Sequence, residues 1–123
     1  MSEVVVHWSL CRAEERLFLQ LGEAPEFLLD PREREILAGL KVPKRRKEWL
    51  LGRFAAKKLC CSWLAGRGRQ AEPGEIAVLP SEDGAPRVEL FGQGPLEVTL
   101  TISHRAGAAL CALVEGHRAP LGA

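Results

Sequence analysis

The fold is decided by one stretch of the sequence, Lys44-Arg-Arg-Lys-Glu-Trp-Leu-Leu-Gly-Arg-Phe-Ala-Ala-Lys57. Good helix formers dominate this stretch and the residues after it, and Gly52 is the only glycine or proline between positions 44 and 65. The pattern therefore predicts one long helix from 44 to about 65. Its apolar side chains point in several directions around the helix axis, which is typical of a central helix covered on most of its sides.

The same helix carries a group of fixed cations. At about 100° per residue, Arg46, Arg53 and Lys57 fall within roughly 40° of one another, which predicts one cationic stripe. The basic run Lys44-Arg-Arg-Lys47 begins the helix, where cations oppose the helix dipole. Such a run is usually solvated surface, but this position favours a bound anion.

Outside the helix, the sequence predicts short strands. Val98-Thr-Leu-Thr-Ile102 alternates apolar and polar residues, as a half-buried strand does, and the apolar run 108–114 can return beside it. Apolar and β-branched runs at 3–10, 76–79 and 87–90 predict further strands. With the long helix, these segments predict an α+β fold, a small and mostly antiparallel sheet packed on that helix.

A shorter helix is predicted before the long one. Asp30 can cap its start, Pro31 suits its first position, and Glu33 suits its first turn by charge. Pro43 stops it, so the helix should run to about Gly39. Residues 11–27 carry mixed signals and are assigned no element.

Composition indicates one globular domain, residues 1–123. The chain has 46% apolar and 27% charged residues, enough for a real core. Its formal charge of +1 argues against bulk nucleic-acid binding, so attraction for phosphate must come from the local cluster at 41–58.

The cysteines predict neither a disulfide framework nor a zinc site. Cys11, Cys60, Cys61 and Cys111 form no Cys-x-x-Cys or Cys/His ligand spacing, and we interpret them as small core residues. The sequence shows no basic-plus-apolar leader and no apolar run near 20 residues. We therefore expect a cytoplasmic protein.

Two polar residues follow the strand 98–102, Ser103 and His104. Taken alone, a single histidine in a turn is more often structural than functional, and the serine hydroxyl could form a simple turn bond. A hydroxyl and an imidazole near fixed cations are, however, groups that a protein uses to hold a phosphorylated ligand.

The combination is more specific than its parts. Arg-Arg-x-Glu-Trp-Leu-Leu-Gly-Arg-x-Ala-Ala-Lys at 45–57, Gly-x-Pro at 84–86 and Ile-Ser-His-x-x-Gly at 102–107 occur in this order before an apolar strand. This set closely resembles the amino-terminal half of the larger, Sfp-type 4′-phosphopantetheinyl transferases, from about Asp30 to Ala123.

The resemblance implies transfer of the phosphopantetheine arm of coenzyme A to a serine of an acyl, peptidyl or aryl carrier protein, with release of adenosine 3′,5′-bisphosphate. In that family the basic helix and the Ser-His pair help to hold the phosphates and the nucleotide. The matching residues are therefore expected to bind coenzyme A. They are Arg45, Arg46 and Arg53 at the nucleotide phosphates, Gly84 and Pro86 at the adenine, and Ser103 and His104 at the 3′-phosphate or pyrophosphate.

The chain departs from the family pattern in two places. The family often has a lysine between the glycine and the proline, where this sequence has Ala85; that contact is expected to be lost or supplied by Arg87. The family also binds Mg²⁺ with the acids of a Gly-x-Asp-x-Glu strand, and this sequence ends in Ala119-Pro-Leu-Gly-Ala123 where that Asp would come next. We therefore expect no catalytic residue and no metal ligand in this chain.

The resemblance also implies partners. The family's fold is two similar halves related by a pseudo-twofold axis, with coenzyme A between them, so the chain is expected to be the N-terminal half without the C-terminal metal-binding half. It should be inactive alone, although Mg²⁺ serves the complete enzyme. The missing half or a second copy is expected to cover apolar surface around the end of the strand 98–103.

Two other classes of protein remain open. A noncatalytic nucleotide- or carrier-protein-binding domain would keep the arginines and the Ser-His pair without needing acids. A small RNA-binding module could use the basic run with Arg67 and Arg69, but no exposed aromatic stacking set is recognisable and the net charge is low.

Overall fold

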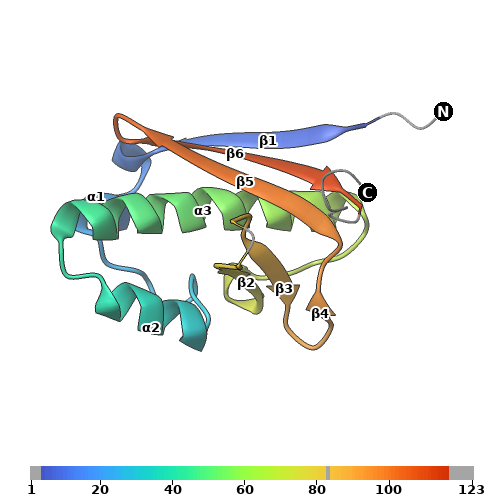
Figure 1. The fold of residues 1–123 in the computed structure, drawn as a ribbon, viewed down its shortest axis with the longest axis horizontal. Helices are drawn as coiled ribbons and strands as arrows, with labels where there is room; N and C mark the ends of the chain where they lie inside the picture. The colour runs from blue at the N-terminus through green and yellow to red at the C-terminus, as the bar shows by residue number, and fades with distance from the viewer. Residues whose placement is uncertain (1–3, 83, 117–123) are drawn as a thin grey trace.

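The long helix α3 (Pro43–Gly66) is the central element of the fold (Figure 1). The computed structural model describes residues 4–82 and 84–116. One side of α3 packs against a three-stranded antiparallel sheet of order β1-β6-β5, and its other side contacts the strand β2 (Ile76–Leu79) and the helix α2 (Pro31–Gly39). The prediction of a central helix covered on most sides is confirmed.

The larger sheet consists of β1 (Val6–Arg12), β5 (Val98–Arg105) and β6 (Ala108–Glu115). Its inward side chains, which face α3, include the fully buried Leu100 and Leu113. Its outer face is apolar and exposed along β1 and β6, where Trp8 is 67% accessible. The predicted strands 98–102 and 108–114 are confirmed, and β5 continues to Arg105. The strand predicted from position 3 begins at Val6 in β1, and residue 3 lies outside the described residues.

The prediction of a single sheet is wrong, because a second sheet of order β2-β3-β4 lies on the other side of α3. It contains β2, β3 (Arg87–Leu90) and the two-residue β4 (Gly94–Pro95). Beyond Pro95, the Leu96 N–H still donates to the Val88 carbonyl of β3 at 2.8 Å, and the chain then crosses to β5 in the larger sheet. The strands predicted at 76–79 and 87–90 are confirmed.

The start of α2 is confirmed as predicted, and its cap is reciprocal. The Glu33 backbone N–H donates to Asp30 Oδ1 at 3.0 Å, and the Asp30 N–H donates to Glu33 Oε1 at 3.0 Å. Pro31 occupies the first helical turn, and the helix ends at Gly39. The unassigned region 11–27 contains two short helical elements, η1 (Ala13–Glu15) and α1 (Leu17–Leu21), and a third, η2 (Pro73–Glu75), precedes β2.

The cysteines are free thiols, and Cys11, Cys60 and Cys111 are fully buried, which confirms them as core residues. Cys61 is only half-buried. Burial raises the pKa of Cys60 and of Cys111 to about 12, so both thiols stay protonated at neutral pH. Within residues 4–82 and 84–116, the helices are too short or too polar to cross a bilayer.

Candidate functional site

A cavity of about 520 Å³ lies between α3, β5 and the loop that joins β2 to β3. We call it the α3–β5 cavity. It brings together Arg53, Gly84, Pro86 and His104, all predicted from the sequence as ligand-binding residues. Its remaining lining residues are Pro80, Ser81, Ala85, Leu100, Thr101 and Ile102.

Arg53 supplies the fixed cation of the cavity. Its Nε donates to the Val78 carbonyl at 3.1 Å, and its guanidinium carbon lies 4.8 Å from the centre of the Trp49 ring, which stacks against it. Burial lowers the pKa of Arg53, and the charge of Glu33 opposes that shift, but a guanidinium remains charged at neutral pH. Among the described residues no carboxylate forms an ion pair with Arg53. The geometry therefore leaves a half-buried positive charge at the cavity wall, available to an anion.

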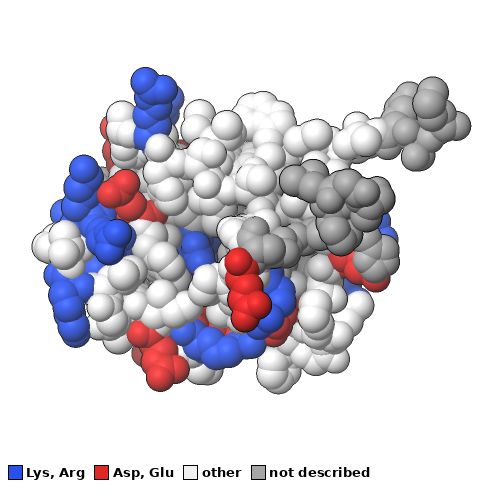
Figure 2. All heavy atoms as spheres, viewed as in Figure 1, with Lys and Arg blue, Asp and Glu red and all other residues white. Residues whose placement is uncertain are grey.

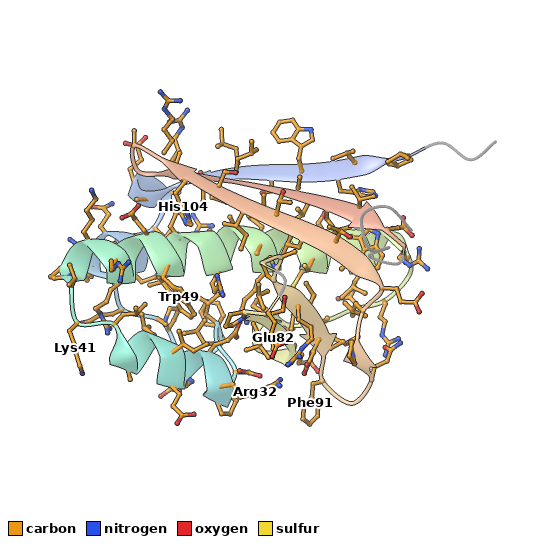
Figure 3. The ribbon with its side chains drawn as sticks, viewed as in Figure 1. Arg32, Lys41, Trp49, Glu82, Phe91 and His104 are labelled. Atoms are coloured by element: carbon orange, nitrogen blue, oxygen red, sulfur yellow. The ribbon has the colours of Figure 1, made fainter. Side chains whose placement is uncertain are left out.

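His104 reaches the cavity from β5 and lies against the backbone of α3. A Cβ atom placed on Gly52 would be 2.7 Å from His104 Nε2, so the imidazole touches the helix where no side chain stands between them. Figure 3 shows His104 beside α3, and Gly52 directly precedes Arg53 in that helix. The imidazole from β5 and the guanidinium from α3 thus line one cavity.

The loop between β2 and β3 forms the opposite wall. Gly84 has a φ of 93°, a left-handed conformation that favours glycine, and Pro86 follows it before β3. Ser81 Oγ donates to the Ala85 carbonyl, which closes the loop on itself. Arg87, the residue expected to supply the contact of the lysine absent at Ala85 if that contact is kept, pairs with Glu89 at 2.7 Å and is not among the residues that line the cavity.

Three of the predicted ligand-binding residues do not line the cavity. Arg45 is exposed near the start of α3, at the end of the molecule where lysine and arginine side chains gather (Figure 2). Arg46 donates to the carbonyls of Leu37 at 2.7 Å, Leu40 at 3.1 Å and Gly22 at 3.1 Å. It therefore ties the ends of α1 and α2 to α3.

Ser103 lies on the outer face of the larger sheet. Side chains alternate along a strand, so Ser103 points away from the face that Leu100 and His104 share. It pairs with Leu110, which is 46% exposed on that outer face. The expected Ser-His pair is therefore divided between two faces of β5.

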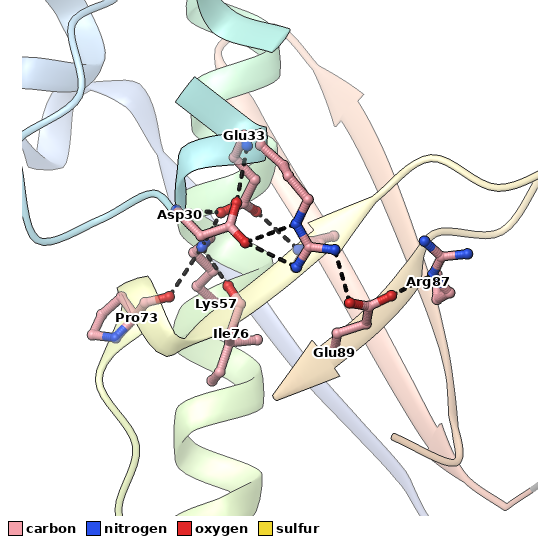
Figure 4. A network of polar contacts seen from close by, with 9 residues as sticks. Asp30, Glu33, Lys57, Pro73, Ile76, Arg87 and Glu89 are labelled. Atoms are coloured by element: carbon pink, nitrogen blue, oxygen red, sulfur yellow. Dashed lines mark hydrogen bonds and ion pairs between the residues drawn. The ribbon is translucent and has the colours of Figure 1, made fainter. Parts of the chain in front are cut away.

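The predicted cationic stripe on α3 is wrong as a single surface, because Lys57 is buried inside the protein. Lys57 Nζ lies 2.5 Å from Glu33 Oε1 and also donates to the carbonyls of Pro73, at 3.0 Å, and Ile76 (Figure 4). Glu33 Oε2 accepts from the Val78 N–H at 2.8 Å. We call these groups the closed polar cluster.

Both ionisable side chains of the closed polar cluster are 0% exposed. Burial lowers the pKa of Lys57, and the charge of Glu33 opposes that shift. A signal in the sequence could have found this lysine: Leu50 and Leu64, seven residues before and after it, are buried core residues of the same helix. The partner glutamate, 24 positions away, carried no such signal.

Metal-ligating side chains do not gather in the part of the chain that the structure describes. No group of three or more His, Cys, Asp or Glu side chains within residues 4–82 and 84–116 could hold a metal ion. Among the residues that the structure describes, no carboxylate lines the α3–β5 cavity. The stretch 119–123, where the sequence resemblance located the missing metal strand, lies outside the described residues.

Comparison with known proteins gives one consistent result. A holo-[acyl-carrier-protein] synthase from Geobacillus kaustophilus is 35% identical over 98 residues, which cover 79% of this chain and 74% of that protein. No protein-family model matches the chain.

Solved structures show the same fold. A holo-(acyl-carrier-protein) synthase from Bacillus anthracis, in complex with CoA (3′,5′-ADP), has a TM-score of 0.68 at 24% identity and covers 94% of this chain and 99% of its own. The ACPS-CoA complex from Chronobacterium ammoniagenes has a TM-score of 0.67 at 25% identity, over 95% of this chain and 100% of its own. The likeness therefore extends along nearly the whole of both chains.

Proposed function

This chain belongs to the holo-(acyl-carrier-protein) synthase family, and from that membership we propose that it binds coenzyme A in the α3–β5 cavity. The sequence prediction of a phosphopantetheinyl transferase is confirmed at the level of the family. The finer assignment, to the amino-terminal half of a larger Sfp-type enzyme, rests on the sequence motifs and stays part of this proposal.

The observation that carries the proposal is the convergence of Arg53 and His104 on one cavity wall. A guanidinium without a carboxylate partner among the described residues is suited to a phosphate, because its donors match phosphate oxygens in a planar fork. The imidazole adds a donor from a second element, and the loop around Gly84 and Pro86 offers a surface for the adenine. Coenzyme A is also the ligand that two of the similar structures contain.

The proposed reaction is that of the family. A carrier-protein serine hydroxyl forms a bond to the phosphorus that bears the pantetheine arm, the pyrophosphate bond breaks, and adenosine 3′,5′-bisphosphate leaves. Arg53 would hold the phosphates of the leaving nucleotide and offset their charge. The proposed substrate is an acyl carrier protein, because the similar protein from Geobacillus kaustophilus is a holo-[acyl-carrier-protein] synthase.

We further propose that the chain alone binds coenzyme A but does not transfer its arm. The described residues offer no acidic cluster for the metal that the family motif implies, so this chain would supply only the phosphate-binding part of a site. The acids would come from a sister half, because a second copy of this chain would bring no Gly-x-Asp-x-Glu strand. A noncatalytic nucleotide-binding domain is the second candidate, and the same lack of acids favours it.

We propose that a partner or a second copy also covers a separate apolar surface, the outer face of the larger sheet, which is turned away from α3 and does not line the α3–β5 cavity. Val6, Trp8 and Leu10 of β1 are exposed there, and Leu110 of β6 lies directly opposite Leu10. Single monomers rarely expose a contiguous apolar patch of this kind. Apolar surface was expected around the end of the strand 98–103, but the exposed apolar side chains of this sheet lie chiefly on β1 and β6.

The proposed compartment is the cytoplasm, where the free thiols would stay reduced.

The test is the mass of an apo-carrier protein after incubation with the chain, coenzyme A and Mg²⁺. A complete holo-(acyl-carrier-protein) synthase serves as positive control. We expect the control to add the phosphopantetheine arm and this chain to leave the carrier unchanged while it binds the nucleotide. Addition of the arm at enzymatic rates would show that the chain carries the activity by itself. Failure to bind either coenzyme A or the bisphosphate would overturn the proposed function.

A further inference from the structure

Gly52 stands in the interior of α3, where glycine is an unfavourable residue. A glycine in a helix interior costs about 1 kcal/mol relative to alanine, because its backbone loses more freedom on folding. The surrounding residues are good helix formers, and alanine occurs twice shortly afterwards, at Ala55 and Ala56. Helix propensity therefore does not explain the glycine.

The contacts around Gly52 do explain it. A Cβ atom there would lie 2.7 Å from His104 Nε2, 3.0 Å from His104 Cε1 and 3.1 Å from Ile102 Cγ2. The first distance is shorter than real Cβ contacts. At Gly66, the last residue of the same helix, an added Cβ would meet nothing within 4 Å. The close approach is thus particular to Gly52.

Of the groups that meet at Gly52, the imidazole is the one free to move. Strand β5 is held by its pairing with β6 and by the fully buried Leu100, so its backbone cannot withdraw from α3 without disturbing the core. The His104 side chain is exposed and can rotate toward solvent. A methyl group at position 52 would therefore displace the imidazole from the cavity wall beside Arg53.

We propose that Gly52 is a positioning residue. Because it has no side chain, the His104 imidazole can lie against α3 and line the cavity beside Arg53. The inference rests on the proposed function, since His104 is taken to contact a phosphate of coenzyme A. It adds that the affinity of the cavity depends on a residue that itself offers no group to the ligand.

The test compares Gly52→Ala with Gly66→Ala, each in the wild-type and in the His104→Ala background, by calorimetric titration with adenosine 3′,5′-bisphosphate. Gly52→Ala should weaken binding about ten- to a hundredfold, the loss expected for one charge-assisted hydrogen bond. Gly66→Ala should leave the affinity unchanged. In the His104→Ala background, Gly52→Ala should cause no further loss, because the displaced group is already gone. An equal loss in both backgrounds would overturn the proposal.

A second readout works without any ligand. The imidazole ring signals of His104 in the NMR spectrum should shift in Gly52→Ala and stay in place in Gly66→Ala. If the wild type binds no nucleotide but these signals shift, the proposed function fails and the positioning role stands. If Gly52→Ala does not fold, the Gly52→Ala/His104→Ala double variant should regain the fold. Unmoved ring signals, or a double variant that stays unfolded, would contradict the inference.

Discussion

Arg53 and Lys57 lie one turn apart on α3, and each donates a hydrogen bond to a backbone carbonyl of β2, Arg53 to Val78 and Lys57 to Ile76. Their surroundings differ. Lys57 is fully buried and neutralised by Glu33, whereas Arg53 has no carboxylate partner among the described residues and lines an open cavity. Both side chains thus make the same type of contact with β2, but Lys57 stabilises the fold, whereas we propose that the charge of Arg53 binds a ligand. A cation on this helix does not by itself indicate a binding site, because Lys57 is paired inside the protein.

The largest expected effect comes from breaking the closed polar cluster. Lys57→Met removes the ammonium and leaves the Glu33 carboxylate buried without its partner, which should lower the free energy of unfolding by about 3–5 kcal/mol. Urea denaturation measures the loss. Lys58→Met is the matched control, because Lys58 is exposed on the same turn and its removal should change stability by less than about 0.5 kcal/mol. Similar losses in both variants would show that the buried pair contributes nothing special.

A smaller loss is expected at Arg46, whose guanidinium serves the fold as Lys57 does. Arg46→Ala leaves the carbonyls of Leu37, Leu40 and Gly22 without their donor, at a cost of about 2 kcal/mol in unfolding free energy. Because Arg46 does not line the cavity, nucleotide affinity should stay constant in the folded variant. Thermal unfolding and calorimetric titration of the same sample give the two values. An Arg46→Ala variant that keeps its stability but loses affinity would reverse the assignment.

The smallest expected effect is the loss of stability at alkaline pH that comes from two buried thiols, those of Cys60 and Cys111. Cys60 lies one turn after Lys57, and the Cys111 thiol lies 3.9 Å from the carbonyl of Gly52, the residue before Arg53. Burial raises the pKa of each thiol from 9.0 to about 12, so the unfolded chain ionises first and stability should fall as pH rises from about 9 to about 12.

The expected size of this alkaline loss is about 1 kcal/mol per thiol at pH 10. Unfolding free energies of the wild type, Cys60→Ala and Cys111→Ala, measured between pH 8 and pH 10, check it. Each substitution should reduce the fall of unfolding free energy with pH by the contribution of the thiol that it removes. If the pH dependence of stability is the same in Cys111→Ala as in the wild type, the Cys111 thiol is not shielded from water as its burial implies.

Much of the fold could be predicted because its signals are local. The cap at Asp30 and Pro31, the alternation along β5 and the uninterrupted helix formers of α3 each lie within a few residues of the element that they specify. The division into two sheets could not be predicted, because it depends on where the chain crosses after Pro95 and not on any strand's own pattern. Of the two short helices in 11–27, α1 packs against α3 and against η1, and neither has a strong signal in its own sequence.

The candidate site was predicted in part for the same reason. Arg53, Gly84, Pro86 and His104 were found because a motif joins segments that are distant in sequence. Ser103 is part of the same motif, but β5 continues to Arg105, and the alternation of side chains along the strand turns Ser103 to the outer face. Helical periodicity places Lys57 on the same face of α3 as Arg53. It does not show which cation has a carboxylate partner, because the partner of Lys57, Glu33, comes from another helix.

The most direct test of the account is calorimetric titration of adenosine 3′,5′-bisphosphate, without added metal, into the wild type, Arg53→Ala and Arg45→Ala. Both arginines are expected from the sequence to contact the nucleotide phosphates, but of the two only Arg53 lines the cavity. We predict that Arg53→Ala weakens binding about ten- to a hundredfold, because a charge-assisted phosphate contact is lost, and that Arg45→Ala stays close to the wild type. Equal affinities for the wild type and Arg53→Ala would contradict the central claim that this cavity holds the phosphates of coenzyme A.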